Sequence, residues 1–253
     1  MAFQFKSRGE QAAGYDSEFG RLLQRGNALL EQYRQSDPMS RRQLAPAVQQ
    51  LLTGVNQRAQ MFRAQGNPEA ALAGFKLMHD FAQAFGDRDT EGQWLNAMGQ
   101  LCRGMGRNEE ALDHYSQALL IAKELGIRQG EAAVLSNMGV AYLSMGRHKD
   151  SIHYFEQALR MCKDLGDRNG ECVALHNIGD ACQSMQNHKE AIENFNRALE
   201  INPDFLEALF RKGDSLEKLG RREEAMNCYS RVLLLNPTHA QAQAGLMRLR
   251  GGR

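Results

Sequence analysis

Glycine recurs at fixed intervals along this chain of 253 residues. One series runs through Gly66, Gly106 and Gly146 at intervals of 40, reaches Gln186 at the next place, and ends with Gly220. Two further series keep the same rhythm: Gly99, Gly139, Gly179 and Gly213, and Gly86, Gly126 and Gly166. A period of this length indicates one supersecondary unit copied along the chain, in which each copy buries its apolar face against its neighbours.

The stretch 137–159 shows what one copy contains. Met138, Tyr142 and Met145 recur at spacings of four and three, which predicts an amphipathic helix, and Gly146 follows as its C-cap. Ile152, Phe155 and Leu159 then begin a second helix after a short turn. A connection this short favours an antiparallel helix pair.

Small residues and aromatic rings keep one register in every copy. Gly139 lies inside the first helix, where glycine costs about 1 kcal/mol relative to alanine, so we expect close helix–helix approach there. The aromatic residue of each copy follows sixteen residues later, and the series is Phe75, Tyr115, Phe155, Phe195 and Tyr229. Smaller residues flank most of these rings, as Ser151 and Ala158 flank Phe155.

This combination of glycine, small residue, aromatic ring and small residue resembles the tetratricopeptide repeat, with Pro203 and Pro237 closing the last two copies. The resemblance implies an all-α, right-handed superhelical solenoid of about five helix-turn-helix repeats with capping helices at both ends. It covers residues 52–237, divided at about 52–91, 92–131, 132–171, 172–205 and 206–237. The copies of 40 residues resemble those of spindle-orientation adaptors of the Pins/LGN type and of bacterial peptide-sensing regulators.

The segments outside the repeats, 1–51 and 238–253, are predicted to cap the array. We expect disorder in residues 1–15, then a helix from about Phe19 that ends before Asp37 and Pro38. A longer helix should follow, with Pro46 tolerable only near its start. At the other end, Thr238 is the expected N-cap of a last helix, followed by a basic tail.

Composition excludes several classes of partner. Thirty-one basic against thirty acidic side chains give a net charge of +1, so no bulk field attracts nucleic acid or a membrane surface. No apolar run is long enough for membrane insertion, and the first residues lack the core of a signal peptide. The five cysteines show no metal-type pairing and are expected to be reduced and half-buried in a cytoplasmic protein.

No catalytic or metal-binding motif emerges from the residues. The seven histidines form no His-x-x-x-His pair, and the cysteines show no zinc spacing. No glycine-rich phosphate loop with its lysine is present. We therefore expect no enzyme, no cofactor and no metal ion.

The resemblance also implies where a ligand binds. In tetratricopeptide proteins the first helix of each repeat lines a concave groove, and the inward offsets can be carried onto this chain. We call the resulting set the predicted binding row: Asn56, Gln60, Arg63, Asn96, Gln100, Arg103, Asn137, His176, Asn177, Asp180, Arg211 and Asp214. The asparagines offer donor and acceptor to a peptide backbone, although they are equally suited to bonding a neighbouring helix.

The predicted function is therefore that of a non-enzymatic adaptor for a protein or peptide. Arg63 and Arg103 come early in the row, whereas Asp180, Asp214 and Glu217 come late, so we expect a ligand with an acidic and a basic end. The carboxylate clamp of heat-shock co-chaperones is not expected, since Glu207 stands where a clamp lysine would help. The alternatives are a peptide-responsive regulatory sensor and a structural subunit with exposed thiols and methionines at its contacts; self-association is left open.

Overall fold

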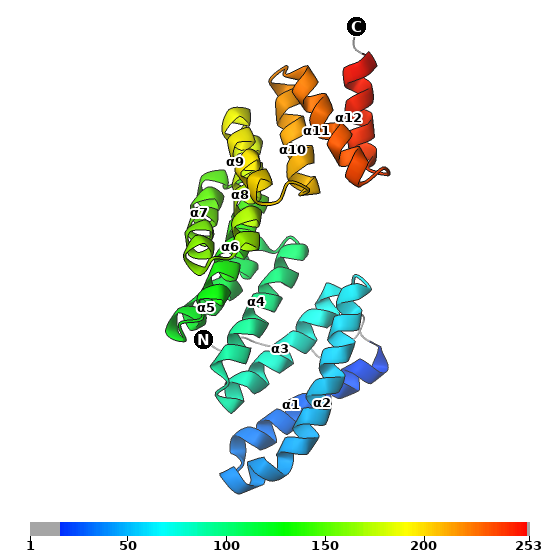
Figure 1. Ribbon diagram of the computed structural model, residues 1–253. Helices are drawn as coiled ribbons and strands as arrows, with labels where there is room; N and C mark the ends of the chain where they lie inside the picture. Colours follow the sequence, from blue (N-terminus) through cyan, green and yellow to red (C-terminus); the bar gives the residue numbers. More distant parts are fainter. Residues whose placement is uncertain (1–15, 252–253) are drawn as a thin grey trace. The chain divides into compact units, whose positions relative to one another are not determined.

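The computed structural model describes residues 16–251, and all regular elements in that range are α-helices (Figure 1). This confirms the predicted all-α class. Residues 1–15, for which disorder was predicted, and the last two residues of the basic tail lie outside the described residues. The helices are α1 (Ser17–Gln35), α2 (Pro38–Ala64), α3 (Pro68–Phe85), α4 (Arg88–Gly104), α5 (Asn108–Glu124), α6 (Arg128–Ser144), α7 (His148–Leu165), α8 (Arg168–Ser184), α9 (His188–Ile201), α10 (Leu206–Lys218), α11 (Arg222–Leu235) and α12 (Ala240–Gly251).

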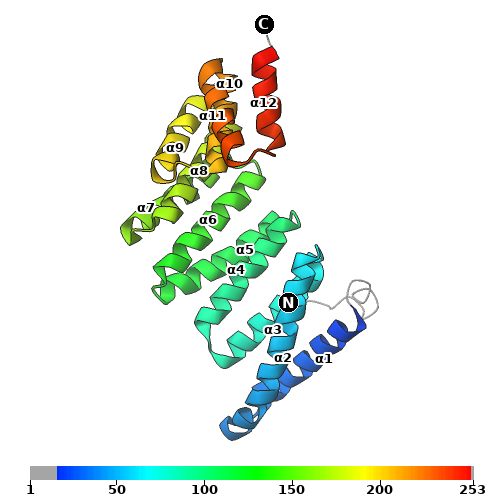
Figure 2. The same cartoon turned by 45° about the vertical axis from the view of Figure 1, so that its right-hand side comes forward.

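The chain divides into two compact units. The described part of unit 1, residues 16–125, contains α1 to α5, and that of unit 2, residues 126–251, contains α6 to α12. Within each unit every helix packs on the next one in the chain, as α4 and α5 or α6 and α7 show (Figure 2). Unit 2 also brings its first helices together, because α8 contacts both α6 and α10. Sequential antiparallel pairing of this kind is typical of a helical-repeat protein.

The turn inside each repeat ends the first helix with a residue of left-handed conformation. Gly146 has φ of 72°, which confirms its predicted role as a C-cap, and the N–H groups of Gly146 and Arg147 bond the carbonyls of Leu143 and Tyr142. Gln186 adopts φ of 61° at the equivalent place, the one positive φ outside glycine among residues 16–251. Its turn makes the same pair of backbone hydrogen bonds, so this repeat keeps the geometry without the glycine.

The predicted close approach of paired helices is present. A Cβ atom added to Gly139 would lie 2.5 Å from Cε1 of Phe155, a ring with no exposed surface. The same arrangement joins Gly99 to Tyr115, Gly179 to Phe195 and Gly213 to Tyr229. In the first repeat the glycine is on the second helix instead: Gly74 of α3 packs against Ala59 of α2. Each bulky ring thus fills a gap that only a residue without a side chain leaves open.

The prediction that Pro46 lies near the start of its helix is wrong. The helix α2 begins at Pro38. Asp37 is its N-cap, because the Asp37 side chain accepts hydrogen bonds from the N–H groups of Met39 and Ser40. Pro46 is therefore an interior residue of a 27-residue helix. Without an N–H it leaves the carbonyl of Arg42 lacking its usual donor four residues on. The good cap at Asp37 explains why the helix starts earlier than proline alone suggests.

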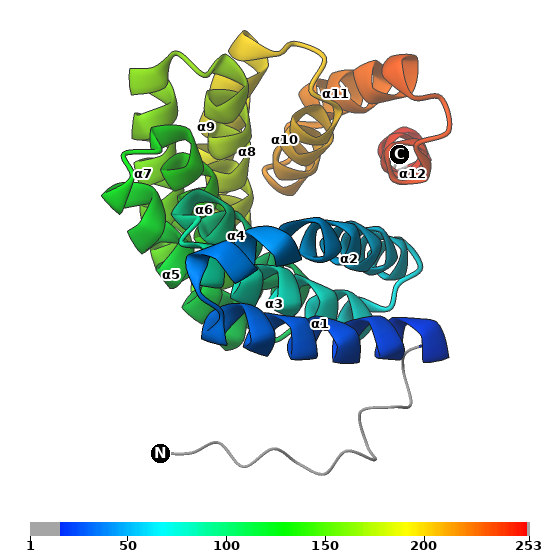
Figure 3. The same cartoon turned by 90° about the horizontal axis from the view of Figure 1, so that it is seen from below.

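Helices at both ends cover the repeats of their own unit. In unit 1, α1 packs along α2 and α3 (Figure 3), and Arg58 of α2 pairs with Asp16 and Glu18 at the start of α1. In unit 2, α12 packs on α11 and places Gly245 against the ring of Tyr229.

The N-cap predicted for α12 is wrong by one residue. The Nδ1 atom of His239 accepts from the N–H of Ala242, so His239 caps the helix, while Thr238 bonds the side chain of Asn236. A histidine is an uncommon cap, which is why the sequence favoured the neighbouring threonine.

Candidate binding site

The predicted binding row lies on the first helices of the repeats, α2, α4, α6, α8 and α10. All twelve of its side chains are half-buried or exposed, and none belongs to the core. In unit 1, Gln60 and Arg63 are exposed on α2, while Asn96, Gln100 and Arg103 are half-buried on α4. In unit 2, Asn137 and Asn177 stand at equivalent places on two helices in contact, α6 and α8.

A cavity of about 830 Å³ in unit 1 lies over α2, between the end of α1 and α3. Its lining includes the apolar side chains Tyr33, Leu52, Met78 and Phe85, the polar Asn56 and Gln57, and the charged Arg41 and Arg42. Asn56 is the single member of the predicted binding row on this lining. The cavity is lined partly by α1, which has no repeat signature, so no sequence pattern predicted it.

Two features make the lining of this cavity specific. Arg41 stacks over the ring of Tyr33 at 5.0 Å and donates from Nε to the Tyr33 carbonyl, which fixes its position. Tyr33 meets Phe85 edge-on with the ring centroids 4.9 Å apart. By contrast, Oδ1 of Asn56 is buried and accepts no hydrogen bond within residues 16–251. A buried acceptor without a donor costs free energy, so this side chain is held at the lining at some expense to the fold.

Arg103 is partly engaged within unit 1. Burial raises the pKa of the Tyr115 hydroxyl, and the nearby Arg103 guanidinium opposes this rise. Asn96 also makes an interaction within the chain, as does Asn137 in unit 2. Some members of the row therefore make interactions within the protein itself.

Three ionisable members of the row come together in unit 2. His176 and Asp180 lie one turn apart on α8, with Nε2 of His176 3.6 Å from a carboxylate oxygen, and Arg211 of α10 approaches the other oxygen to 3.4 Å. The His176 ring also packs against Phe205, with the centroids 4.9 Å apart. Burial lowers the pKa of His176, against the opposing effect of Asp180.

A second polar cluster of unit 2 surrounds Asp214. The hydroxyl of Tyr229 lies 2.7 Å from both Asp214 and Glu217, so its single proton serves one carboxylate at a time. Burial raises the pKa of Asp214. Burial also acts to raise that of Glu217, but the hydrogen bonds from Arg248 and Tyr229 hold it below its ordinary value.

Arg248 is the residue of this surface that the sequence did not place beside the binding row, whereas Gln183 lies at an offset that the family resemblance points to. Arg248 reaches Glu217 from α12, and Gln183 of α8 donates to the carbonyl of Arg211 and to Ser215. The late part of the row was expected to hold three acids around one arginine, whereas two arginines, Arg211 and Arg248, pair with them. Its acidic character is weaker than predicted.

The cysteines are free, in agreement with the predicted reduced state, but they are more deeply buried than predicted. All five are free and buried, so the exposed thiols assumed for a structural subunit are absent from the described surface. One of them, Cys102, lies beside Glu110 and His114, the group among residues 16–251 whose side chains suit a metal ion. No helix in that range combines the length and the apolar character needed to cross a bilayer.

This architecture matches family models and solved structures of known proteins. A tetratricopeptide-repeat model matches residues 50–124 and 130–204, and a second one matches residues 184–249. Among solved structures, a crystal structure of MamA superimposes with a TM-score of 0.55 at 18% identity, covering 72% of this chain and 96% of that one. Another, of the MamA protein, gives 0.53 at 19% identity, covering 75% and 94%.

A third solved structure, the first TPR of Spaghetti (RPAP3) bound to the HSP90 peptide SRMEEVD, covers 47% of this chain and 90% of that one. Its identity is 26% and its TM-score is 0.43, a likeness too low to indicate a ligand here. The search of curated proteins finds no match. Because the family models together span more than half of the sequence, and the helix pairs bear the same pattern, the chain belongs to the tetratricopeptide-repeat family.

Proposed function

We propose that this protein is a non-enzymatic adaptor that binds a peptide or partner helix along the first helices of its repeats. The family is one of interaction modules, and the proposal assigns that role to the predicted binding row. The observation that carries it is the cavity in unit 1, where Asn56 of the binding row lies beside apolar side chains and the charged Arg41 and Arg42. The long repeats, which resemble those of Pins/LGN-type adaptors, support the same kind of function.

The cavity indicates what part of a ligand it takes. A volume of about 830 Å³ lies in the range of pockets that hold small ligands, and it accommodates a few side chains of a peptide. Tyr33, Leu52 and Phe85 favour an apolar anchor residue. Arg41 and Arg42 add positive charge at the same place, which favours an acidic side chain beside the anchor.

Of the two charged ligand ends that we expected, we retain only the acidic one, which would bind to unit 1. Arg63 is exposed on α2, and Arg42 lines the cavity, so an acidic ligand segment fits this unit. In unit 2, Asp180 is already paired with Arg211 and Glu217 with Arg248, which reduces the attraction for a basic segment. We therefore propose an acidic, apolar segment as the principal ligand feature.

Selection from a random peptide library tests this proposal on the full chain. Peptides selected on the wild type should share an apolar residue next to an acidic one. Asn56→Ala should weaken their binding at least about tenfold, since it removes a polar anchor worth about 1.5 kcal/mol. The matched control is Gln117→Ala, which should leave the affinity unchanged. Gln117 is exposed on α5, the second helix of its repeat. Selected peptides that bind both variants like the wild type would remove the cavity from the account.

A structural-subunit role has less support than the adaptor role. A structural subunit was expected to expose thiols at its contacts, but all five cysteines are buried. Exposed methionines remain, notably Met39 and Met247, each with at least 70% of its surface accessible. The sensor alternative differs from the adaptor by a shape change on peptide binding, which small-angle scattering with and without a selected peptide measures directly.

A further inference from the structure

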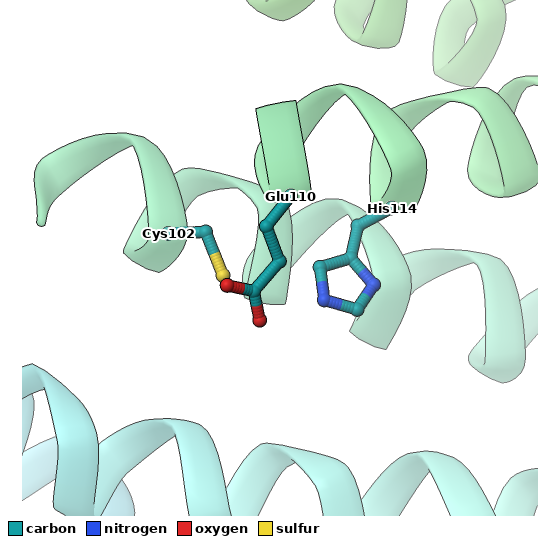
Figure 4. A group of neighbouring side chains, drawn as sticks. All are labelled: Cys102, Glu110 and His114. Carbon is teal, nitrogen blue, oxygen red and sulfur yellow. The ribbon is translucent and has the colours of Figure 1, made fainter. Parts of the chain in front are cut away.

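Cys102, Glu110 and His114 form a side-chain cluster in unit 1 that the binding row does not use. Cys102 lies near the end of α4, while Glu110 and His114 lie one turn apart on α5, so both point from one helix face toward the thiol (Figure 4). One ligand atom from each residue lies within 4.8 Å of the other two. The helix pair α4–α5 thus brings together a thiol, a carboxylate and an imidazole.

From this geometry we propose that Cys102, Glu110 and His114 bind one Zn²⁺ ion. Thiolate sulfur, imidazole nitrogen and carboxylate oxygen are the ligands that zinc takes in proteins. Tetrahedral bonds of 2.0–2.3 Å put neighbouring ligand atoms roughly 3.3–3.6 Å apart, so the three groups must close by about 1 Å. Glu110 is exposed and its long side chain can supply most of that movement. Three protein ligands leave the fourth position to water.

The surroundings of the cluster favour a cation. A Cys102 thiolate beside the Glu110 carboxylate would place two negative charges together, and a divalent cation held by both groups removes that repulsion. Binding replaces the S–H bond by an S–Zn bond and releases the thiol proton to solvent. His114 is not fixed by another role, because its Nδ1 atom is buried without a hydrogen-bond partner.

The chain contains its own comparison for this site. Eighty residues later, Cys182 and Glu190 repeat the thiol and carboxylate, and the pKa of Cys182 is raised to about 11 by burial and Glu190. The third place, however, holds Asn194, whose amide donates to the backbone carbonyl of Glu190. The cysteine–glutamate pair thus recurs in one other repeat, where the third ligand is missing, and within residues 16–251 His114 completes the zinc ligand set.

One neighbouring residue competes with the metal. Arg107 lies 3.6 Å from Glu110 and 2.8 Å from Glu69. When zinc binds, Glu110 must leave this guanidinium, while Glu69 still holds it. Arg107→Gln should therefore tighten zinc binding, an effect that a purely structural role of the cluster does not produce.

Metal titration of the full chain, stripped with a chelator and kept reduced, tests the proposal. We expect one Zn²⁺ per chain by calorimetry with release of a proton, and a thiolate-to-cobalt charge-transfer band when Co²⁺ is the probe. His114→Asn installs the residue that the chain itself uses at 194, so the helix pair should fold. It should lower zinc affinity at least about 100-fold, since loss of an outer-shell partner alone costs about 10–100-fold.

Two further variants make the result decisive. Glu110→Gln changes an exposed side chain and should lower the affinity similarly, so it decides the matter if His114→Asn unfolds. His148→Asn is the matched control, because Nδ1 of His148 is also buried without a partner but lies outside the cluster. Absence of the thiolate–cobalt band in the wild type, or equal zinc affinity in the wild type and Glu110→Gln, would overturn the proposal.

Discussion

At the residue scale, the contacts of single glycines separate two uses of the same amino acid. Gly139 is required by packing, because a Cβ there would meet the Phe155 ring at 2.5 Å. Gly54, also inside a helix, has no atom within 4 Å of its Cβ direction. The sequence predicted the first role correctly, since Gly139 recurs with its aromatic partner at fixed spacing, whereas Gly54 has no such partner.

Replacing Gly139 by alanine should therefore destabilise the protein although alanine is the better helix former. We expect a loss of about 1–3 kcal/mol in the free energy of unfolding, because the buried ring has no room to move. Gly54→Ala is the control and should gain about 0.5–1 kcal/mol. Denaturant unfolding of both variants measures the difference, and a stabilised Gly139→Ala would contradict the packing account.

Gln186 carries a conformational cost at a turn where the other repeats have glycine. A residue with a side chain costs about 1–2 kcal/mol in the left-handed region, and glycine avoids this cost. Glycine also has more conformational freedom in the unfolded chain, which offsets part of the stability gained. Gln186→Gly should thus raise the free energy of unfolding by about 0.5–1 kcal/mol, measured by thermal melting. Gly146→Ala should lower it, and a fall in both variants would mean that the Gln186 side chain stabilises the turn in another way.

His176 should make stability depend on pH. Burial lowers its pKa below the ordinary value of about 6.5, so the unfolded chain takes up a proton there before the folded one does. Its contribution is present above about pH 6.5 and is lost as the pH falls toward the lowered folded pKa. The groups that act on the ring are Asp180, Arg211 and Glu207.

The variant His176→Gln isolates this effect. Its free energy of unfolding should fall less than that of the wild type between about pH 7 and pH 5. His153→Gln, at an exposed position, is the control. Parallel pH profiles for wild type and His176→Gln would show that the ring accepts its proton in the folded state without cost.

At the scale of elements, the sequence predicted helices and their pairing better than contacts between repeats. The stripe Met138, Tyr142 and Met145 and the stop at Gly146 are local signals, so they identify a helix and its end. The pair Arg248–Glu217 joins residues on α12 and α10, and no spacing announces it. The cluster of Cys102, Glu110 and His114 shows the same limit, although Glu110 and His114 at one-turn spacing were a partial signal.

The helix α2 offers a prediction at this scale. Pro46 is exposed in its interior and costs the helix one backbone hydrogen bond. Pro46→Ala should raise the free energy of unfolding by about 1–3 kcal/mol, and Ala45→Gly, one residue earlier, should lower it by about 1 kcal/mol. If Pro46→Ala is destabilising instead, the proline sets a bend on which the packing of α1 or α3 depends.

At the scale of the whole molecule, the family assignment explains most of the sequence. The recurring glycines, rings and small residues build the helix pairs, and the polar first-helix residues form the binding row that we propose. The positions of the predicted binding row come from the family resemblance, and Asn56 is the member that lies on the cavity lining. The cavity itself could not be inferred in this way, because it depends on how α1, outside the repeats, packs on α2 and α3.

The central claim is that the first helices bind the protein's partner. Affinity purification with mass spectrometry from the native source tests it most directly, with a variant carrying Asn56→Ala, Asn137→Ala and Asn177→Ala. A control variant changes second-helix side chains instead: Gln117→Ala, Gln157→Ala and Asn196→Ala. The account predicts that the first variant, still helical, loses a defined set of partners that the control keeps. Retention of every partner by the first variant and their loss from the control would place the binding surface on the second helices.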